Sequence, residues 1–133
     1  MAMRTDSKIL IVSWNPLLEQ TRRLILGTYF ETDSAGRISE VGRRLRESSF
    51  ALIVLCDTIS DSECIEIADL ARLYSESAEL ILLESPERER PEHIKGLRVP
   101  SLQGPMFLLK ICAEVLGSEV ALKYPSDTPL ARS

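Results

Sequence analysis

An unbroken apolar run, ALIVLC, fills residues 51–56 and ends abruptly at Asp57. A run of this kind, with no polar residue alternating into it, predicts a strand that is buried on both faces, as in the centre of a parallel sheet covered by helices. Open sheets of this type carry their sites just beyond the carboxyl ends of such strands. We therefore expect a functional site to centre on Cys56 and Asp57.

The rest of the chain alternates between apolar runs and amphipathic segments. Strands are predicted at residues 9–12, 29–33, 51–56, 80–83 and 97–99. The stretch 84–97 holds two prolines and almost no apolar stripe, so any helix in it should be short or irregular. The last helix should begin at Gly104-Pro105 and stop at Gly117. This alternation predicts an α/β fold, a doubly wound five-stranded parallel sheet with strand order 2-1-3-4-5.

The spacing of apolar residues also predicts which face each helix buries. For the helix that follows Pro16, the apolar face is expected to hold Leu17, Leu18, Thr21, Leu24 and Ile25, and the polar face Glu19, Gln20, Arg22 and Arg23. Ser60 and Glu63 match a capping box, which predicts the start of another helix. The expected stripe of the last helix is Phe107, Leu108, Ile111, Cys112, Val115 and Leu116.

Length and composition limit the class of protein. With 133 residues, we expect one domain over residues 8–117, flanked by flexible segments at 1–7 and 118–133. The 20 acidic and 16 basic residues give a net charge of −4 without a basic stripe, which argues against direct nucleic-acid binding. No signal peptide or membrane span is visible, so we expect a cytoplasmic protein whose three cysteines are buried free thiols.

Four segments resemble the receiver domain of bacterial response regulators. KILIV at residues 8–12, followed by Ser-Trp-Asn-Pro and LLEQTRRLIL, is similar to the first strand and helix of that family. FALIVLC resembles its third strand, AELILLES its fourth and GPMFLLKICAEVLG its last helix. The resemblance spans residues 8–117 and implies the flavodoxin-like fold of that family and a part in two-component signal transduction.

The same resemblance implies which positions would carry phosphorylation chemistry. In the family, an acidic pair after the first strand and the acceptor Asp after the third hold a Mg²⁺ ion, which prefers carboxylate oxygens. The acidic pair falls here on Ser13 and Trp14, with Asn15 next, so no carboxylate stands there. The acceptor position falls on Cys56, with Asp57 one place later.

Two further positions of the family, one after the fourth strand and one before the last helix, are altered as well. The Thr or Ser position falls on Glu84 or Ser85, and the Lys position falls on Ser101. The chain therefore resembles a degenerate pseudo-receiver, which keeps the fold and has lost phosphorylation. The resemblance in this form implies no catalytic residue, no cofactor and no metal.

Three residues at these positions have alternative interpretations. Asp57 is either an acceptor displaced one place by a bulge or a polar strand end that caps a loop N–H, and the cap is favoured because a one-residue slip turns a side chain to the opposite face. Cys56 is expected to be a small buried residue rather than a reactive thiol, because its charged neighbours in the sequence are mostly acidic and raise a thiol pKa. Trp14 either plugs the altered metal cleft or contacts a partner.

The sequence leads to three hypotheses of function. The first is a non-catalytic signalling domain that binds a histidine kinase or another regulator independently of phosphorylation, with no contact to nucleic acid or membrane and with homodimer formation open. The alternative is a genuine phospho-acceptor receiver that uses Asp57, and a third is a small-ligand or redox sensor built on Cys56 and Trp14. The expected partner surface is the irregular region from Glu84 to Gln103 with the exposed face of the last helix.

Overall fold

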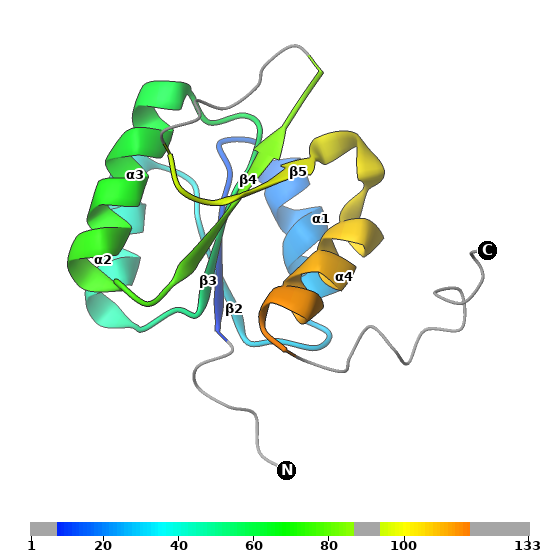
Figure 1. Ribbon diagram of the computed structural model, residues 1–133, viewed down its shortest axis with the longest axis horizontal. Coiled ribbons are helices and arrows are strands. Elements are labelled where there is room, and N and C mark those ends of the chain that lie inside the picture. The colour runs from blue at the N-terminus through cyan, green and yellow to red at the C-terminus, as the bar shows by residue number, and fades with distance from the viewer. Residues whose placement is uncertain (1–7, 87–93, 118–133) are drawn as a thin grey trace.

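A five-stranded parallel sheet forms the centre of the structure, a computed structural model in which residues 8–86 and 94–117 are described (Figure 1). The strand order is β2-β1-β3-β4-β5, which confirms the predicted 2-1-3-4-5 order, and every neighbouring pair is parallel. The strands are β1 (Ile9–Val12), β2 (Thr32–Ala35), β3 (Leu52–Leu55), β4 (Glu79–Glu84) and β5 (Leu97–Pro100).

Helices cover both faces of the sheet. α1 and α4 lie on one side of the sheet, and α2 and α3 lie on the other (Figure 1). Their bounds are α1 (Pro16–Leu26), α2 (Ile38–Glu47), α3 (Asp61–Tyr74) and α4 (Pro105–Val115), with a 3-10 turn, η2 (Ser101–Gln103), before α4. No helix of the described residues is long and apolar enough to cross a membrane.

The core consists of two apolar clusters, one on each face of the sheet, because successive side chains of a strand point to opposite faces. In β3, Leu52 and Val54 belong to the cluster under α1 and α4, whereas Ile53 and Leu55 belong to the cluster under α2 and α3. All residues of β1 and β3 are fully buried, as the apolar run predicts for central strands. Val12, Val54 and Leu82 lie in the sheet interior as expected.

Polar side chains fix where the helices begin. Asn15 caps α1, since its Oδ1 accepts hydrogen bonds from the backbone N–H groups of Leu17 and Leu18 at 3.0 and 3.2 Å. The predicted capping box of α3 is confirmed, with Ser60 and Glu63 each accepting a backbone N–H of the other.

The predicted orientation of α1 is wrong. Leu17 and Leu24, placed on the apolar face, are 70% and 64% exposed, whereas Arg22, placed on the polar face, is only 8% exposed. The buried row of α1 runs through Arg22 and Leu26, which lie one turn apart and therefore face the same way. Leucines surround this helix on several sides, so their spacing alone does not fix which row meets the sheet.

Two other elements differ in detail from prediction. The second strand is Thr32–Ala35, not residues 29–33 as predicted. Phe30 is a core residue between α1 and this strand, and Ala35 is the only buried residue of the strand, which lies at the edge of the sheet. On α4 the buried residues include Leu109 and Ala113, which the predicted stripe omitted, while Ile111 is only partly buried.

Residues 85–96 connect β4 to β5, and no residue of this connection that the structure describes is helical. The expected short or irregular fourth helix falls largely on residues 87–93, outside the described part of the chain. The expected flexible segments 1–7 and 118–133 lie outside it as well.

The packing of α4 predicts a large difference between neighbouring positions. Leu109 is 1% exposed in the core, whereas Lys110 is exposed. Leu109→Ala should lower the free energy of unfolding by roughly 2–5 kcal/mol because it leaves a cavity, and Lys110→Ala should change it by less than about 0.5 kcal/mol. Urea denaturation followed by circular dichroism measures both, and similar losses in the two variants would contradict this placement of the helix.

Candidate functional site

The loops that follow β1 and β3 meet at the carboxyl edge of the sheet. The Cys56 N–H donates to the Val12 carbonyl at 3.0 Å, which extends the pairing of the two strands past their ends. Beyond this point, Thr58 Oγ1 accepts the Trp14 N–H at 3.1 Å and lies 3.5 Å from Ser13 Oγ. The residues expected from the sequence to form the site are thus brought together, and Thr58, which the sequence did not single out, joins them.

Ser13 occupies one of the two positions where the receiver pattern would have an acid. Its side chain is buried, and its Oγ accepts the Asn15 N–H at 3.2 Å and lies 3.2 Å from the Asn15 carbonyl. The Asn15 side chain in turn caps α1. The oxygen atoms of both residues therefore hold the turn into α1 together.

Trp14 is anchored to the start of α3. Its Nε1–H donates to Glu63 Oε1 at 2.9 Å, and the same oxygen accepts the Ser60 N–H at 3.2 Å. The hydrogen bond from Trp14, followed by those from Ser60, lowers the pKa of Glu63 below its ordinary value of 4.5. The indole packs against the core cluster under α2 and α3, which is the opposite face of the sheet from Cys56.

Asp57 faces a cation that the sequence did not predict. Arg22 reaches from α1, and its Nη1 lies 3.9 Å from Asp57 Oδ1. The two side chains are 10% and 22% exposed, and neither of these two atoms has a hydrogen-bond partner in the described structure. Oδ1 therefore does not cap a loop N–H, as the favoured interpretation expected. It forms a loose, mostly buried ion pair with Arg22 instead.

Cys56 is fully buried at the position of the family's acceptor. Burial raises the pKa of its thiol, and this effect outweighs the positive charge of Arg22 and hydrogen bonds from Arg22 and Ser13, which lower it. The expectation of a small buried thiol is confirmed, but its cause is corrected. Desolvation is the main cause of the raised pKa, the negative charge of Asp57 adds only a small effect, and the larger charge effect is that of Arg22, which lowers the pKa.

The other cysteines are buried and free as well, as predicted. Cys112 lies on α4 in the core, where burial raises its pKa to about 12. Neither Cys112 nor Cys64 is accessible to a reactant in the described structure.

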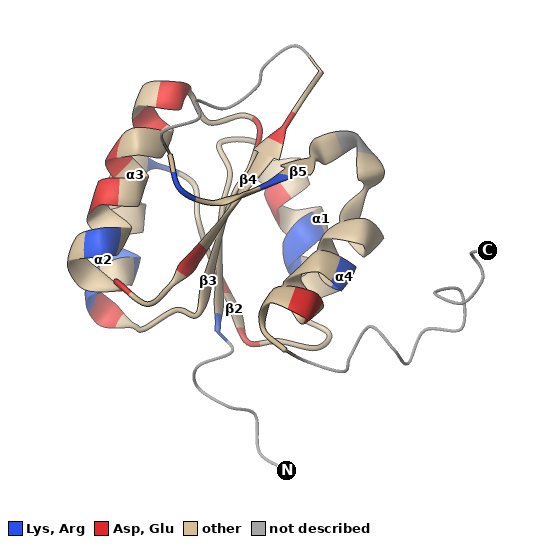
Figure 2. Ribbon diagram, viewed as in Figure 1, with Lys and Arg blue, Asp and Glu red and all other residues tan. Residues whose placement is uncertain are grey.

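The remaining expected site residues lie at the ends of β4 and β5. Figure 2 shows acidic residues at both ends of β4, which are Glu79 and Glu84. Because Leu55 pairs with Leu82, the same register places Glu84 on the strand beside Asp57. Glu84 Oε2 lies 3.9 Å from Arg98 Nε on β5, so each of these two acids faces an arginine. Ser85 follows β4, and Ser101 begins η2.

These residues do not fit a magnesium site. The ion requires several oxygen ligands, preferably carboxylates, but Ser13, Trp14 and Asn15 supply no carboxylate. The guanidinium of Arg22 already faces Asp57, and its buried Nη1 would repel a second cation there. Among the described residues, no group of three or more His, Cys, Asp or Glu side chains is arranged to hold a metal ion.

No protein-family model matches the sequence, and no curated protein matches it. Solved structures do match it. The chain is similar to the chemotaxis protein CheY4 of Vibrio cholerae, with 18% identity and a TM-score of 0.69 over 86% of this chain and 99% of that one. It is also similar to the receiver domain of a sensor histidine kinase from Pseudomonas aeruginosa that has a magnesium ion in its cleft, with 14% identity and a TM-score of 0.70 over 84% and 98% of the two chains.

A third similar structure contains a partner. It is the response regulator TrrA of Thermotoga maritima, in complex with the histidine kinase ThkA, with 20% identity and a TM-score of 0.64 over 82% of this chain and 97% of that chain. At these identities the likeness establishes the fold. The chain has the fold of CheY-like receiver domains.

The hydrogen bond between Trp14 and Glu63 predicts a pH effect. A carboxyl group whose pKa is lower in the folded state than its ordinary value of 4.5 stabilises the fold above that value, and the stabilisation is lost as the pH falls through the folded-state pKa. Trp14→Phe should bring the pKa of Glu63 closer to its ordinary value and make stability fall less steeply on acidification. Urea denaturation at a series of pH values measures this, and in a Glu63→Gln background the Trp14→Phe change should leave the pH profile unaltered.

The ion pair between Arg22 and Asp57 predicts an energetic coupling. Arg22→Met should lower the free energy of unfolding by about 1–3 kcal/mol, because it leaves a mostly buried carboxylate without its counter-charge. In an Asp57→Asn background the same change should cost much less. Arg23→Met, which removes an exposed pair with Glu19, is the matched control and should cost less than about 1 kcal/mol. Equal costs in the two backgrounds would show that the pair contributes nothing.

Proposed function

We propose that this chain is a cytoplasmic signalling module that acts by binding a histidine kinase or another regulator, without phosphorylation and without catalysis. The observation that carries the proposal is the guanidinium of Arg22 beside Asp57, 3.9 Å from its carboxylate oxygen, at the sheet edge where a receiver domain would be phosphorylated. A fixed cation therefore faces the carboxylate that, in a phosphorylated receiver, would have to bind an exchangeable metal ion.

The chemistry of phosphoryl transfer supports this proposal. Transfer to a carboxylate requires stabilisation of charge on the phosphoryl oxygens and on the attacking and leaving oxygens. The positive charge of Arg22 could stabilise phosphoryl oxygens. Its side chain is buried, however, including Nη1, so it has little freedom to move with a phosphoryl group during transfer. Ser101 supplies no cation where the family would have a lysine, and Cys56 is fully buried.

The partner is proposed by analogy with the fold. TrrA, a regulator with the same fold, is seen bound to its histidine kinase. The carboxyl edge of this chain keeps the loops of a receiver domain and joins them by hydrogen bonds between Trp14, Thr58 and Glu63. A rigid edge of this kind can be recognised by another protein without any change in its covalent state.

One observation favours the alternative, a genuine acceptor at Asp57. The side chain is 22% exposed, although Oδ1 itself is buried, so part of the residue is open to a small donor. A third function, as a sensor built on Cys56 and Trp14, finds less support, because the two side chains lie on opposite faces of the sheet.

Acetyl phosphate with Mg²⁺ distinguishes these functions. We expect the intact mass of the purified protein to remain unchanged and the fluorescence of Trp14 to be insensitive to Mg²⁺. An added phosphoryl group that disappears in Asp57→Asn would establish the acceptor and overturn the proposal. A mass shift that persists in Asp57→Asn and vanishes in Cys56→Ser would point to a modified thiol.

A further inference from the structure

Two leucines of α1 project into solvent. Leu17 is 70% and Leu24 is 64% exposed, and they lie seven residues apart on the helix. Residues spaced by three, four or seven positions share one face of a helix, so Gln20 and Thr21 lie between the two leucines on that face. We call these four exposed residues, Leu17, Gln20, Thr21 and Leu24, the leucine row.

The leucine row lies opposite the buried side of α1. The buried residues of this helix are Arg22 and Leu26. A rotation of about 100° per residue places both of them roughly half a turn away from the middle of the row. The row therefore points straight away from the sheet, and all four of its residues are exposed in the described structure.

The surface of the leucine row is mostly apolar and carries no charge. The Thr21 hydroxyl donates to the Leu17 carbonyl at 3.0 Å, so its proton is used within the helix and its methyl group is left for contact. Glu19 and Arg23, which lie outside the row, form an ion pair with each other at 2.6 Å. The row thus presents two leucines and a methyl group, with Gln20 as its strongly polar member.

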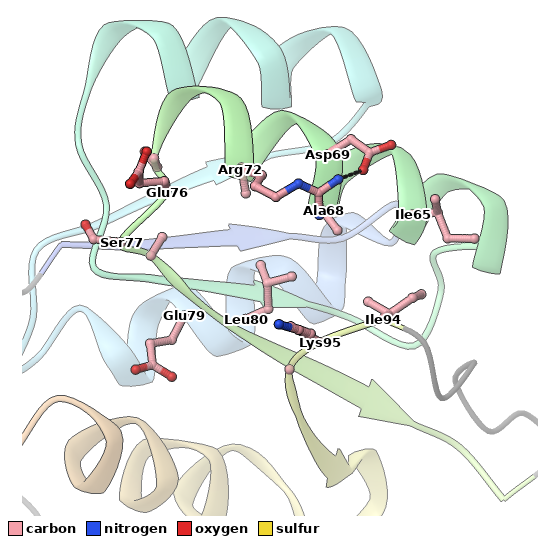
Figure 3. Close-up of a pocket in the computed structure, with 14 residues that line it drawn as sticks. Ile65, Ala68, Asp69, Arg72, Glu76, Ser77, Glu79, Leu80, Ile94 and Lys95 are labelled. Carbon is pink, nitrogen blue, oxygen red and sulfur yellow. Dashed lines mark hydrogen bonds and ion pairs between the residues drawn. The ribbon is translucent and has the colours of Figure 1, made fainter.

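Two other surfaces of the described structure carry charge. The hollow between α3 and the start of β4 has charged side chains in its lining, including Asp69, Arg72 and Lys95 (Figure 3). On the exposed side of α3, the guanidinium of Arg46 lies over the ring of Tyr74, 5.9 Å from its centroid. The leucine row differs from both, because a partner can cover it without removing a charged group from water.

The spacing within the leucine row matches the contact surface of paired helices. In helices that pack side by side, the contacting residues recur at alternating intervals of four and three, and two-stranded pairs favour a β-branched residue at one position with leucine at the other. Leu17, Thr21 and Leu24 follow this spacing, with the β-branched Thr21 between the two leucines. A helix that carries the same row would therefore fit against α1.

We propose that the leucine row is the contact surface of a symmetric dimer, in which it packs against the same row of a second copy of this chain. A twofold contact brings residues near the axis close to their own copies, so a charged residue there would be repelled by its own copy. The leucine row contains no charged residue. It also pairs leucine with leucine in either helix direction, Leu17 with Leu17 and Leu24 with Leu24 when parallel, and Leu17 with Leu24 when antiparallel.

The size of the row predicts a weak dimer. α1 has 11 residues, which corresponds to a length of about 16 Å and a width of roughly 10 Å. This contact is well below the ~800 Å² per partner of a standard interface, so we expect a dissociation constant on the order of 10–100 µM. The dimer therefore forms where the local concentration of the chain is high.

Sedimentation equilibrium of the purified chain, from about 5 µM to about 1 mM, measures this association. We expect a monomer–dimer equilibrium within that range. Leu24→Lys should weaken the dimer by at least about tenfold, because it places a charge in an apolar contact. Leu73→Lys, the same substitution at a leucine of α3 that is 70% exposed, is the matched control and should leave the equilibrium unchanged.

A pair of variants tests whether the row meets its own copy. Thr21 lies at the middle of the row, so Thr21→Lys and Thr21→Glu should each weaken the dimer through repulsion between like charges. An equimolar mixture of the two variants should associate at least about tenfold more strongly than either variant alone, because opposite charges then face each other. Circular dichroism melting confirms that each variant is folded.

Three outcomes would overturn the inference. A chain that stays monomeric throughout the concentration range would leave the leucine row to a helix of a different protein. A dimer that Leu24→Lys leaves intact would place the contact on another surface. A mixture of the Thr21 variants that associates no better than either variant alone would show that the row does not meet its own copy. None of these measurements involves Asp57, so phosphorylation of that residue would refute the proposed function without deciding the dimer.

Discussion

Burial of the central strand on both of its faces is the constraint on which the rest of the structure depends. β3 has no exposed side chain, so an apolar layer must lie against each face. Helices supply these layers, α1 and α4 on one face and α2 and α3 on the other. Parallel pairing of β3 with β1 and β4 then aligns the carboxyl ends of the three strands. For this reason the loops that carry Ser13 and Asp57 lie at the same edge as Glu84, the last residue of β4.

The sequence was sufficient to predict the elements that are buried on both faces, and it was insufficient to predict the edge strand and the rotation of α1. The apolar strands β1 and β3, the apolar centre of β4 and the capping box of α3 were predicted, because burial on both faces and end capping leave local signals. β2 was misplaced because it is an edge strand with only Ala35 buried, so neither an apolar run nor an alternation marks it. The rotation of α1 was wrong because Arg22 counts as polar in any pattern, although its long apolar stem packs well against a core.

The same distinction explains the site. The sequence pattern correctly predicted that Ser13, Trp14, Cys56 and Asp57 lie at one edge of the sheet, because that prediction requires only the ends of the strands and their order. It missed Arg22 and Thr58, whose contacts join residues far apart in the sequence and depend on the rotation of a helix and the path of a loop. Glu63 was recognised only as a cap, and its bond to Trp14 has no local signal. Arg22 changes the chemistry most, because it places a fixed positive charge beside Asp57, the acid that follows the acceptor position in the sequence.

Where the charges are already matched, little binding energy remains for a ligand. At the carboxyl edge, Asp57 faces Arg22 and Glu84 faces Arg98, so a new charged group must compete with an existing partner. The arginine beside each acid therefore disfavours the binding of a further cation at this edge.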